Sequence, residues 1–313
     1  MTDRPLVILT EPIDESARCW LADRMDLHEL PSTDPGFGKL LTRAEGIVIR
    51  TATRVDSDLL DRAPMLRVVA RAGVGLDGVD LEACRDRGVR VLNTPDANTQ
   101  AVVEFVISAV TGFLRPRDRV TTALQPDEWA AMRAPDRAAI QMDELTFGVL
   151  GFGRIGSRVA RVASAIGFDV IYHDLLDINA ADRGSARPVD RGTLLDSSDV
   201  LSIHVDGRPE NLNLLGPDEI RRLGDESVLV NTSRGLVIDE SALANRLRES
   251  DSLTAILDVH ALEPIPDESP LLGLENAILH PHIAARTRTG LRAMSWVVRD
   301  LVQHLSVRES SPI

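Results

Sequence analysis

The sequence predicts an α/β protein with two domains, each a parallel β-sheet covered by helices. Short apolar runs alternate with helical patterns along the whole chain, as they do where parallel strands are buried on both faces. A long apolar segment at 98–114 and a charged segment at 115–143 divide this alternation into two series. With 313 residues, the chain is long enough for two separate cores.

The first series predicts four buried strands, and the clearest helical patterns between them are at 56–63 and 80–87. The four expected strands are 6–9, 46–49, 66–69 and 89–92. Segment 98–114 is apolar on nearly all sides, so we expect a helix there that is buried all round. Segment 115–143 is charged and contains prolines, which favours an arm or loop.

The second series predicts six more strands and a helix at 155–166, which Gly167 can terminate. The expected strands are 146–150, 170–172, 200–203, 228–230, 255–257 and 277–279. The tail, 289–307, is predicted to be one helix that returns to the first domain. We therefore expect one domain from 1–97 and 288–313, an inserted domain at 98–287, and a cleft between them.

Composition narrows the class of protein. The chain is 43% hydrophobic and 27% charged, which is typical of a soluble globular protein, and its net charge is -13. This acidity argues against nucleic acid or an anionic membrane as the main partner. Cys19 and Cys84 form neither a metal-ligand spacing nor a disulfide framework, so we expect no metal and a cytoplasmic location. Residues 1–10 are interpreted as a first strand and not as a leader.

A glycine-rich turn opens the second series. The run Gly151-Phe152-Gly153-Arg154-Ile155-Gly156 lies between a predicted strand and a predicted helix, and Asp174 ends the next strand. This context is typical of a dinucleotide-binding turn. Together with the alternation of strands and helices in both series, it predicts Rossmann-like or flavodoxin-like parallel-sheet domains. Gly151 would permit the tight turn, Gly153 the approach of the pyrophosphate, and Gly156 close packing of helix on strand.

Asp174 would accept hydrogen bonds from a ribose 2′-OH and repel a 2′-phosphate, which favours NAD over NADP. The alternative is an ordinary strand–helix connection with a surface aspartate.

Three isolated ionisable residues, Arg234, Glu263 and His282, each follow an apolar run that is predicted to be a strand. Ligands of open parallel sheets bind outside the carboxyl ends of the strands, so these side chains are expected to converge beside the nicotinamide. Such a group can move a hydride and a proton together. Taken alone, Arg234 also suits a surface ion pair, Glu263 a solvated turn, and His282 a satisfied loop histidine.

The chain resembles the D-isomer-specific 2-hydroxyacid dehydrogenase family, in particular its phosphoglycerate dehydrogenase-like branch. The matching motifs span most of the chain: Arg71-Ala72-Gly73-Val74-Gly75-Leu76-Asp77, Asn93-Thr94-Pro95, 151–156, Asn231-Thr232-Ser233-Arg234-Gly235, Asp258 with Glu263-Pro264, and Pro281-His282-Ile283-Ala284. The resemblance implies a substrate domain built from both chain ends, an NAD domain between them, and a homodimer through the NAD domain. Because the chain ends soon after its last predicted helix, we expect no C-terminal regulatory domain.

The resemblance also implies catalytic roles. His282 would protonate the carbonyl oxygen of a 2-keto acid during its reduction by NADH, and Glu263 would orient His282 and favour its protonated form. Arg234 would bind the substrate carboxylate and carbonyl oxygen. At the cofactor the resemblance places Gly151, Gly153, Arg154, Ile155, Gly156, Asp174, Val205, Thr232, Asp258 and Ala284. At a small anionic substrate it places Arg50, Arg71, Val74, Gly75 and Asn98.

Two departures from the family pattern concern charge. Arg286 stands where small residues are frequent, and it suggests a substrate with a second anionic group such as a phosphate, phosphonate or carboxylate; a solvent-facing arginine is the alternative. Arg50 and Arg54 could hold the same second group; the alternative is that Arg54 and Arg71 face solvent or pair with Asp56 or Asp77. Asp206 replaces a proline that often follows His204-Val205, and it puts an acid near the cofactor groove.

Two other functions remain open at this point. Oxidation of an anion such as phosphite or formate uses the same scaffold, although a formate enzyme would lack an arginine-rich anion pocket. An NADH-sensing binding protein of the corepressor type is a different class, which the absence of an evident peptide-docking extension disfavours.

Overall fold

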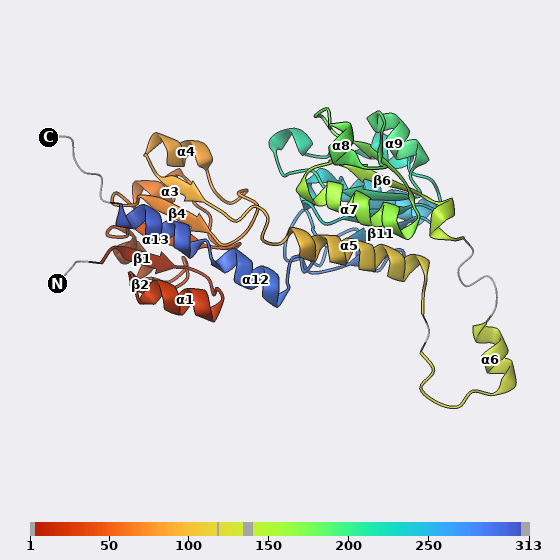
Figure 1. Ribbon diagram of the computed structural model, residues 1–313, viewed down its shortest axis with the longest axis horizontal. Coiled ribbons are helices and arrows are strands. Elements are labelled where there is room, and N and C mark those ends of the chain that lie inside the picture. Colours follow the sequence, from red (N-terminus) through yellow and green to blue (C-terminus); the bar gives the residue numbers. More distant parts are fainter. Residues whose placement is uncertain (1–3, 118, 134–139, 308–313) are drawn as a thin grey trace. The chain divides into compact units, whose positions relative to one another are not determined.

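The computed structural model describes residues 4–117, 119–133 and 140–307, and it divides into two compact units (Figure 1). The first unit comprises Met1–Asn98 and Arg286–Ile313, and the second comprises Thr99–Ala285. Every described strand pairing is parallel, as predicted.

The first unit contains a five-stranded sheet in the order β2-β1-β3-β4-β5. Its strands are β1 (Leu6–Leu9), β2 (Asp26–Glu29), β3 (Gly46–Ile49), β4 (Val68–Arg71) and β5 (Arg90–Leu92). This is the flavodoxin-like order, in which the chain reverses direction across the sheet between β1 and β3. The ends of these two strands are therefore the expected place for a ligand.

Helices cover both faces of this sheet: α1 (Glu15–Ala22), α2 (Phe37–Leu41), α3 (Ser57–Asp61), α4 (Leu81–Asp86) and α13 (Val298–Ser306). Helix α12 (Arg288–Ser295) packs on α1. Alternate residues of β1 enter different cores, Val7 with α1 and α13 and Ile8 with α2 to α4. The C-terminal helix α13 packs on β3 and β4, so the tail does return to the first unit.

The tail is not the single helix that was predicted, because it is interrupted at Trp296 and Val297. Ser295 provides the physical reason. Its hydroxyl donates to the carbonyl of Leu291 at 2.6 Å and accepts the backbone N–H of Asp14 at 2.9 Å. A serine that bonds back to the preceding turn tends to bend a helix, and here it also ties α12 to the start of α1.

The second unit contains a seven-stranded sheet in the order β12-β11-β10-β9-β6-β7-β8. Its strands are β6 (Thr146–Leu150), β7 (Asp169–His173), β8 (Arg187–Pro188), β9 (Val200–Ile203), β10 (Val228–Asn231), β11 (Thr254–Leu257) and β12 (Ala277–Leu279). The order from β8 to β11 is that of a Rossmann sheet, and β12 extends it by one strand. The chain reverses direction between β6 and β9, where a dinucleotide is expected to bind.

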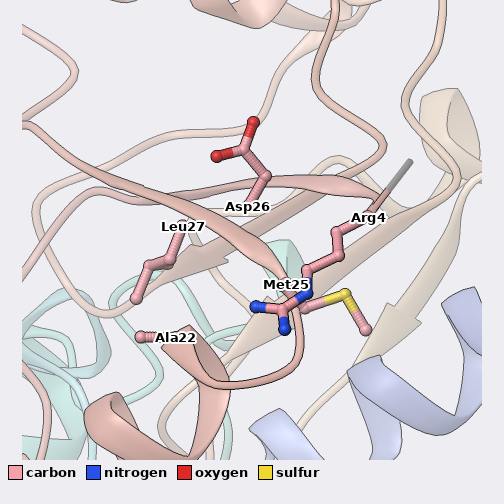
Figure 2. Close-up of a pocket in the computed structure, with 5 residues that line it drawn as sticks. All are labelled: Arg4, Ala22, Met25, Asp26 and Leu27. Atoms are coloured by element: carbon pink, nitrogen blue, oxygen red, sulfur yellow. The ribbon is translucent and has the colours of Figure 1, made fainter. Parts of the chain in front are cut away.

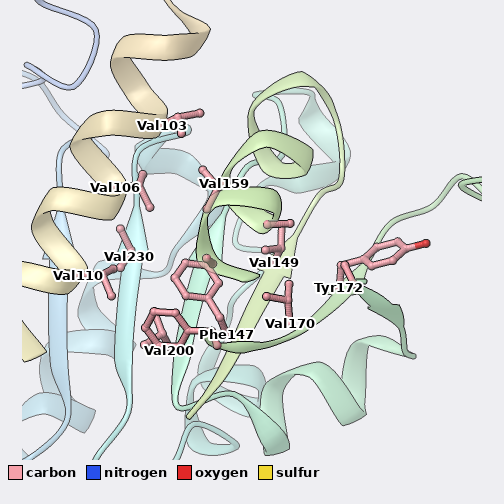
Figure 3. Close-up of a cluster of buried hydrophobic side chains, with 14 of the residues drawn as sticks. Val103, Val106, Val110, Phe147, Val149, Val159, Val170, Tyr172, Val200 and Val230 are labelled. Carbon is pink, nitrogen blue, oxygen red and sulfur yellow. The ribbon is translucent and has the colours of Figure 1, made fainter. Parts of the chain in front are cut away.

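The helices of this unit are α5 (Thr99–Leu114), α6 (Pro126–Met132), α7 (Arg154–Ile166), α8 (Ala180–Arg183), α9 (Arg191–Ser197), α10 (Pro217–Arg221) and α11 (Glu240–Glu249). Short 3₁₀ turns lie at Met142–Glu144, Pro209–Asn211 and Gly235–Val237. Figure 3 shows Val103, Val106 and Val110 of α5 packed towards Phe147, Val200 and Val230 of the sheet. The positions of these valines fix α5 against β6, β9 and β10.

Two expectations for segment 98–143 need correction. Helix α5 is not buried all round in the single chain, because Glu104, Ser108 and Phe113 are exposed. The segment after it is not wholly irregular, since α6 starts at Pro126. The N–H of Gln125 is bonded to the side chain of Glu128 at 2.8 Å, which stabilises the first turn of α6. Residues 134–139 lie outside the described residues.

A hollow in the first unit lies away from its carboxyl strand ends. It measures about 480 Å³ and is lined by Arg4, Ala22, Met25, Asp26 and Leu27 (Figure 2). These residues surround the beginnings of β1 and β2. Since ligands of parallel sheets bind at the opposite ends of the strands, this hollow is not the expected substrate site.

In the described part of the chain, no helix combines the length and the apolarity that crossing a membrane requires. The same residues contain no group of three or more His, Cys, Asp or Glu side chains placed to hold a metal ion.

Candidate active site

The glycine-rich turn between β6 and α7 has the geometry that the sequence predicted. Gly151 has φ +91°, and a Cβ there would lie 2.8 Å from the carbonyl oxygen of His204. A Cβ on Gly156 would lie 2.0 Å from the carbonyl oxygen of Gly151, so only glycine lets α7 pack this close. A Cβ on Gly153 would meet nothing within 4 Å. The exposed first turn of α7, with Gly153 and Arg154, therefore leaves open space in front of its free N–H groups.

Asp174 directly follows β7 and is tied to this turn. Its Oδ2 accepts the N–H of Phe152 at 2.6 Å, and its Oδ1 accepts the N–H of Leu176 at 2.8 Å. Each carboxylate oxygen retains a lone pair for a further donor. These residues fit NAD: the first turn of α7 would hold its pyrophosphate, and Asp174 would hold its ribose. Ile155 packs against the core beneath this turn, and Val205 follows β9 at the neighbouring strand end.

His282 and Glu263 form a hydrogen-bonded pair beyond the ends of β12 and β11. The distance from His282 Nδ1 to Glu263 Oε2 is 2.7 Å, and 41% and 35% of these side chains are exposed. Because a carboxylate only accepts, Nδ1 is the donor, and Nε2 of His282 remains for a substrate. The pair can therefore hold an oriented acid at this edge of the sheet.

Asp258 holds the backbone around His282 in place. His282 has φ +53°, a left-handed conformation that side chains other than glycine seldom adopt. The fully buried carboxylate of Asp258 accepts the N–H groups of Ile283 and Ala284 at 2.7 and 2.8 Å. Both Asp258 oxygens are thus bonded to the loop after His282, which gives this aspartate a role in the loop's shape beyond the cofactor contact that the sequence suggested.

Arg234 lies on the turn after β10. Asn231 shapes this turn: its Oδ1 accepts from Ser233, and its Nδ2 donates to the carbonyl of Arg234 at 2.9 Å. Arg234 donates from Nη1 to the carbonyl of Ser233 at 2.7 Å. The hydroxyl of Thr232 is buried without a hydrogen-bond partner among the described residues. This leaves Thr232 able to bond a ligand, as expected for a cofactor-binding residue.

His204 is a second histidine at a strand end, and it does not suit proton transfer. Its Nε2 lies 2.9 Å from the Ser202 hydroxyl, and burial lowers its pKa from 6.5 to about 3. It is therefore neutral at pH 7. Asp206, which departs from the family pattern, forms a bidentate pair with Arg208, and this hydrogen bond lowers the pKa of Asp206.

In the first unit, an arginine group lies at the ends of β3 and β4. Arg71 donates from Nε to the carbonyl of Arg50 at 3.1 Å. Arg50 donates from Nη1 to Pro12, and its Nε is buried without a partner among the described residues. Burial lowers the pKa of Arg50, the negative charge of Glu11 raises it, and the positive charge of Arg286 lowers it. Arg50 and Arg286 are thus neighbouring cations, and Glu11 offsets part of their charge.

Glu11 lies beside these arginines, and the sequence analysis did not identify it. Its carboxylate accepts four backbone N–H groups, from Arg50, Thr51, Ala52 and Thr53, at 2.9 to 3.1 Å. These bonds fix the loop that carries Arg50. Its position in the sequence was a signal, because Glu11 follows the apolar strand β1 as Arg234 follows β10.

The other expected substrate residues lie in the same unit. Val74 accepts a hydrogen bond from Asn93 through its carbonyl at 2.7 Å, which holds the turn that also contains Gly75. The side-chain oxygen of Asn98 is buried with no partner in the part of the chain described.

Comparison with known proteins agrees with the fold. The family model for the D-isomer specific 2-hydroxyacid dehydrogenase NAD binding domain matches residues 107–284. A (S)-sulfolactate dehydrogenase of Chromohalobacter salexigens is 34% identical over 96% of this chain and 99% of its own length. A D-3-phosphoglycerate dehydrogenase of Archaeoglobus fulgidus is 30% identical over 96% of this chain, which spans only 57% of that relative. The crystal structure of the TT0316 protein of Thermus thermophilus superposes with a TM-score of 0.83, at 31% identity and 98% coverage of both chains.

The sheet order, the turn at Gly151 and the matched domain define the class, an oxidoreductase whose cofactor is NAD. Within that class, the chain belongs to the D-isomer specific 2-hydroxyacid dehydrogenase family.

Proposed function

We propose that this protein reduces a 2-keto acid to a D-2-hydroxy acid, or catalyses the reverse oxidation, and that its substrate carries a second anionic group. The observation that carries the reaction is the 2.7 Å bond between His282 and Glu263, which leaves His282 Nε2 to face a substrate oxygen. Substrate binding would use Arg234 for the carboxylate and the carbonyl oxygen.

In the proposed reaction, the bound cofactor supplies or accepts the hydride at the substrate's C2. His282 donates a proton from Nε2 to the carbonyl oxygen during reduction and takes it back during oxidation. Glu263 keeps the imidazole oriented through Nδ1 and compensates the positive charge of its protonated form. Arg234 stabilises the negative charge that develops on the same oxygen.

The proposed second anionic group rests on the arginines of the first unit. Arg50 has a buried Nε that lacks a partner among the described residues, and the nearby charge of Arg286 is also positive. An anion there would satisfy both the hydrogen bond and the charge. Two relatives support this proposal by their names, because sulfolactate and phosphoglycerate each carry a second acid group beside the carboxylate.

A substrate panel tests this function. We expect NADH oxidation with 2-keto acids, and higher kcat/KM for those that carry a second sulfonate, phosphate or carboxylate. Replacement of Arg286 by alanine should lower kcat/KM for the doubly charged substrates by about 10-fold and leave singly charged ones within about 2-fold. If no 2-keto acid is reduced while phosphite or formate is oxidised, the 2-keto acid assignment is wrong. Tight NADH binding without turnover of any small anion would instead indicate a sensor.

Cofactor choice gives a second prediction, for Asp174→Asn and Asp174→Ala. Loss of the negative charge should lower the ratio of the NADPH dissociation constant to the NADH dissociation constant by at least about 10-fold in both variants. The asparagine variant keeps an oxygen for Phe152 or Leu176, so it separates the effect of charge from the shape of the turn. Fluorescence titration measures both constants, and an unchanged ratio in both variants would contradict the role given to Asp174.

We also propose that the protein is a cytoplasmic homodimer that pairs through its NAD-binding domain. Helix α5 supports this proposal, since Phe113 on its outer side is 39% exposed next to the apolar residues that pack on the sheet. Sedimentation equilibrium should give twice the chain mass of 34.2 kDa, and a monomer at micromolar concentration would contradict it.

A further inference from the structure

His260 lies between Asp258 and Glu263 on the loop after β11, and no role has been given to it so far. It is buried, with 7% of its surface exposed. We propose that His260 is a positioning residue that holds the loops after β10, β11 and β12 in one arrangement, so that Glu263 and His282 meet. This inference deepens the proposed function and rests on it for the catalytic meaning of that pair.

The imidazole of His260 connects its own loop to the loop of His282. Its Nε2 lies 2.8 Å from the carbonyl oxygen of His280. A carbonyl only accepts, so Nε2 carries the proton and donates it. The ring of His280 in turn packs edge-on against Phe105 of α5, with centroids 5.2 Å apart. The residue two positions before His282 is therefore fixed from two sides.

The main chain of His260 holds Glu263, the hydrogen-bond partner of His282. Its N–H donates to Glu263 Oε1 at 3.1 Å, while Glu263 Oε2 bonds to His282. One residue thus restrains both members of the pair, Glu263 through its main chain and the His282 loop through its ring. A displacement of the His260 main chain would disturb both contacts at once.

The loop after β10, which carries Arg234, also contacts His260. A Cβ on Gly235 would lie 1.9 Å from the carbonyl carbon of His260 and 2.0 Å from its oxygen. The residue after Arg234 is therefore pressed against the main chain of His260, and glycine is required there for steric reasons. The turn of Arg234 and the loop of His260 consequently cannot shift independently.

A histidine that only fills space would not need this directed bond. Without the donor, the carbonyl of His280 would be left unsatisfied in a partly buried place, which favours displacement of the loop. Displacement of a catalytic group by about 1 Å lowers the rate of reaction by about 100-fold. His260 thus acts on the reaction through the position of His282, without touching the substrate.

The test compares His260→Phe with His260→Gln. Phenylalanine keeps a ring and removes the donor, whereas the glutamine amide can reach the position of Nε2 and donate to His280. We expect His260→Phe to lower kcat for the best 2-keto acid by about 10- to 100-fold, with the dissociation constant of NADH within about 2-fold of the parent. We expect His260→Gln to recover kcat to within about 3-fold of the parent, which a purely space-filling role would not produce.

Crystal structures of both variants give a readout that does not depend on turnover. In His260→Phe, the His282 Nδ1 to Glu263 Oε2 distance should exceed about 3.5 Å, the limit of a hydrogen bond, and in His260→Gln it should stay near 2.7 Å. If His260→Phe does not fold, His260→Met against His260→Gln makes the same comparison. His28→Gln, which changes a histidine of the first unit paired with Asp26, is the matched control and should match the parent.

An unchanged kcat, or an unchanged His282–Glu263 distance, in the variant without a donor would overturn the inference. If the parent protein reduces no 2-keto acid, the proposed function fails, and the distances still decide whether His260 positions the pair.

Discussion

Replacement of His282 by asparagine should lower kcat for 2-keto acid reduction by about 100-fold or more, because positioned proton donors contribute factors of about 10² to 10⁴. Asparagine is the most informative substitution. His282 has φ +53°, and asparagine tolerates this left-handed conformation better than most residues. The loop should therefore keep its shape, so that the loss reports the missing acid and not a distorted backbone.

Binding of NADH separates this effect from a structural one. The dissociation constant of NADH should stay within about 3-fold of the parent, since His282 is expected to act mainly in the transition state. His28→Asn, remote in sequence and in the other unit, is the control and should leave kcat unchanged. If His282→Asn retains more than about a tenth of the parental kcat, His282 is not the proton donor.

Glu263→Gln tests the charge of the second member of the pair. The glutamine can still accept a hydrogen bond from His282 Nδ1, but it no longer offsets the positive charge of a protonated imidazole. Reduction needs the protonated imidazole, so kcat for 2-keto acids should fall. A kcat equal to that of the parent would separate Glu263 from the reaction.

The buried strands of this fold were predictable, because each is a short apolar run that ends in a polar turn. Residues 200–203 and 277–279 have the predicted bounds. The edge strands β2 and β8 were missed, since Asp26–Glu29 and Arg187–Pro188 are mostly polar and gain their strand conformation only by pairing with β1 and β7. The capping pattern of Gln125 and Glu128 indicates the start of α6, and the sequence analysis overlooked it.

The strand-end rule also located the groups of the candidate site. It pointed to Glu263 and His282, which the structure brings within hydrogen-bond distance. Glu11 and His260 also follow strands, but the rule does not tell what their side chains bond. Their side chains bond to main-chain groups, whose positions depend on how loops fold and not on residue type.

Replacement of Arg234 by glutamine should lower kcat/KM for 2-keto acids by about 10³-fold, which corresponds to about 4 kcal/mol of transition-state stabilisation. The magnitude follows from the two tasks proposed for this side chain, a charged bond to the carboxylate and stabilisation of the developing oxyanion. Arg234→Lys keeps the charge and loses the planar fork, so it should recover only part of the activity. Arg187→Gln is the control, because Arg187 forms an exposed ion pair with Asp169, of a kind that contributes little to stability.

The comparison of Arg234→Gln with Arg234→Lys decides what the arginine does. If its charge alone mattered, lysine would restore kcat/KM almost fully, whereas a need for two parallel hydrogen bonds leaves the lysine variant well below the parent. Asn231 fixes the turn through the Arg234 carbonyl, so neither substitution needs to disturb the backbone. NADH binding should consequently be unchanged in both variants. Weakened NADH binding with an unaltered kcat would show that Arg234 serves the cofactor and not the substrate.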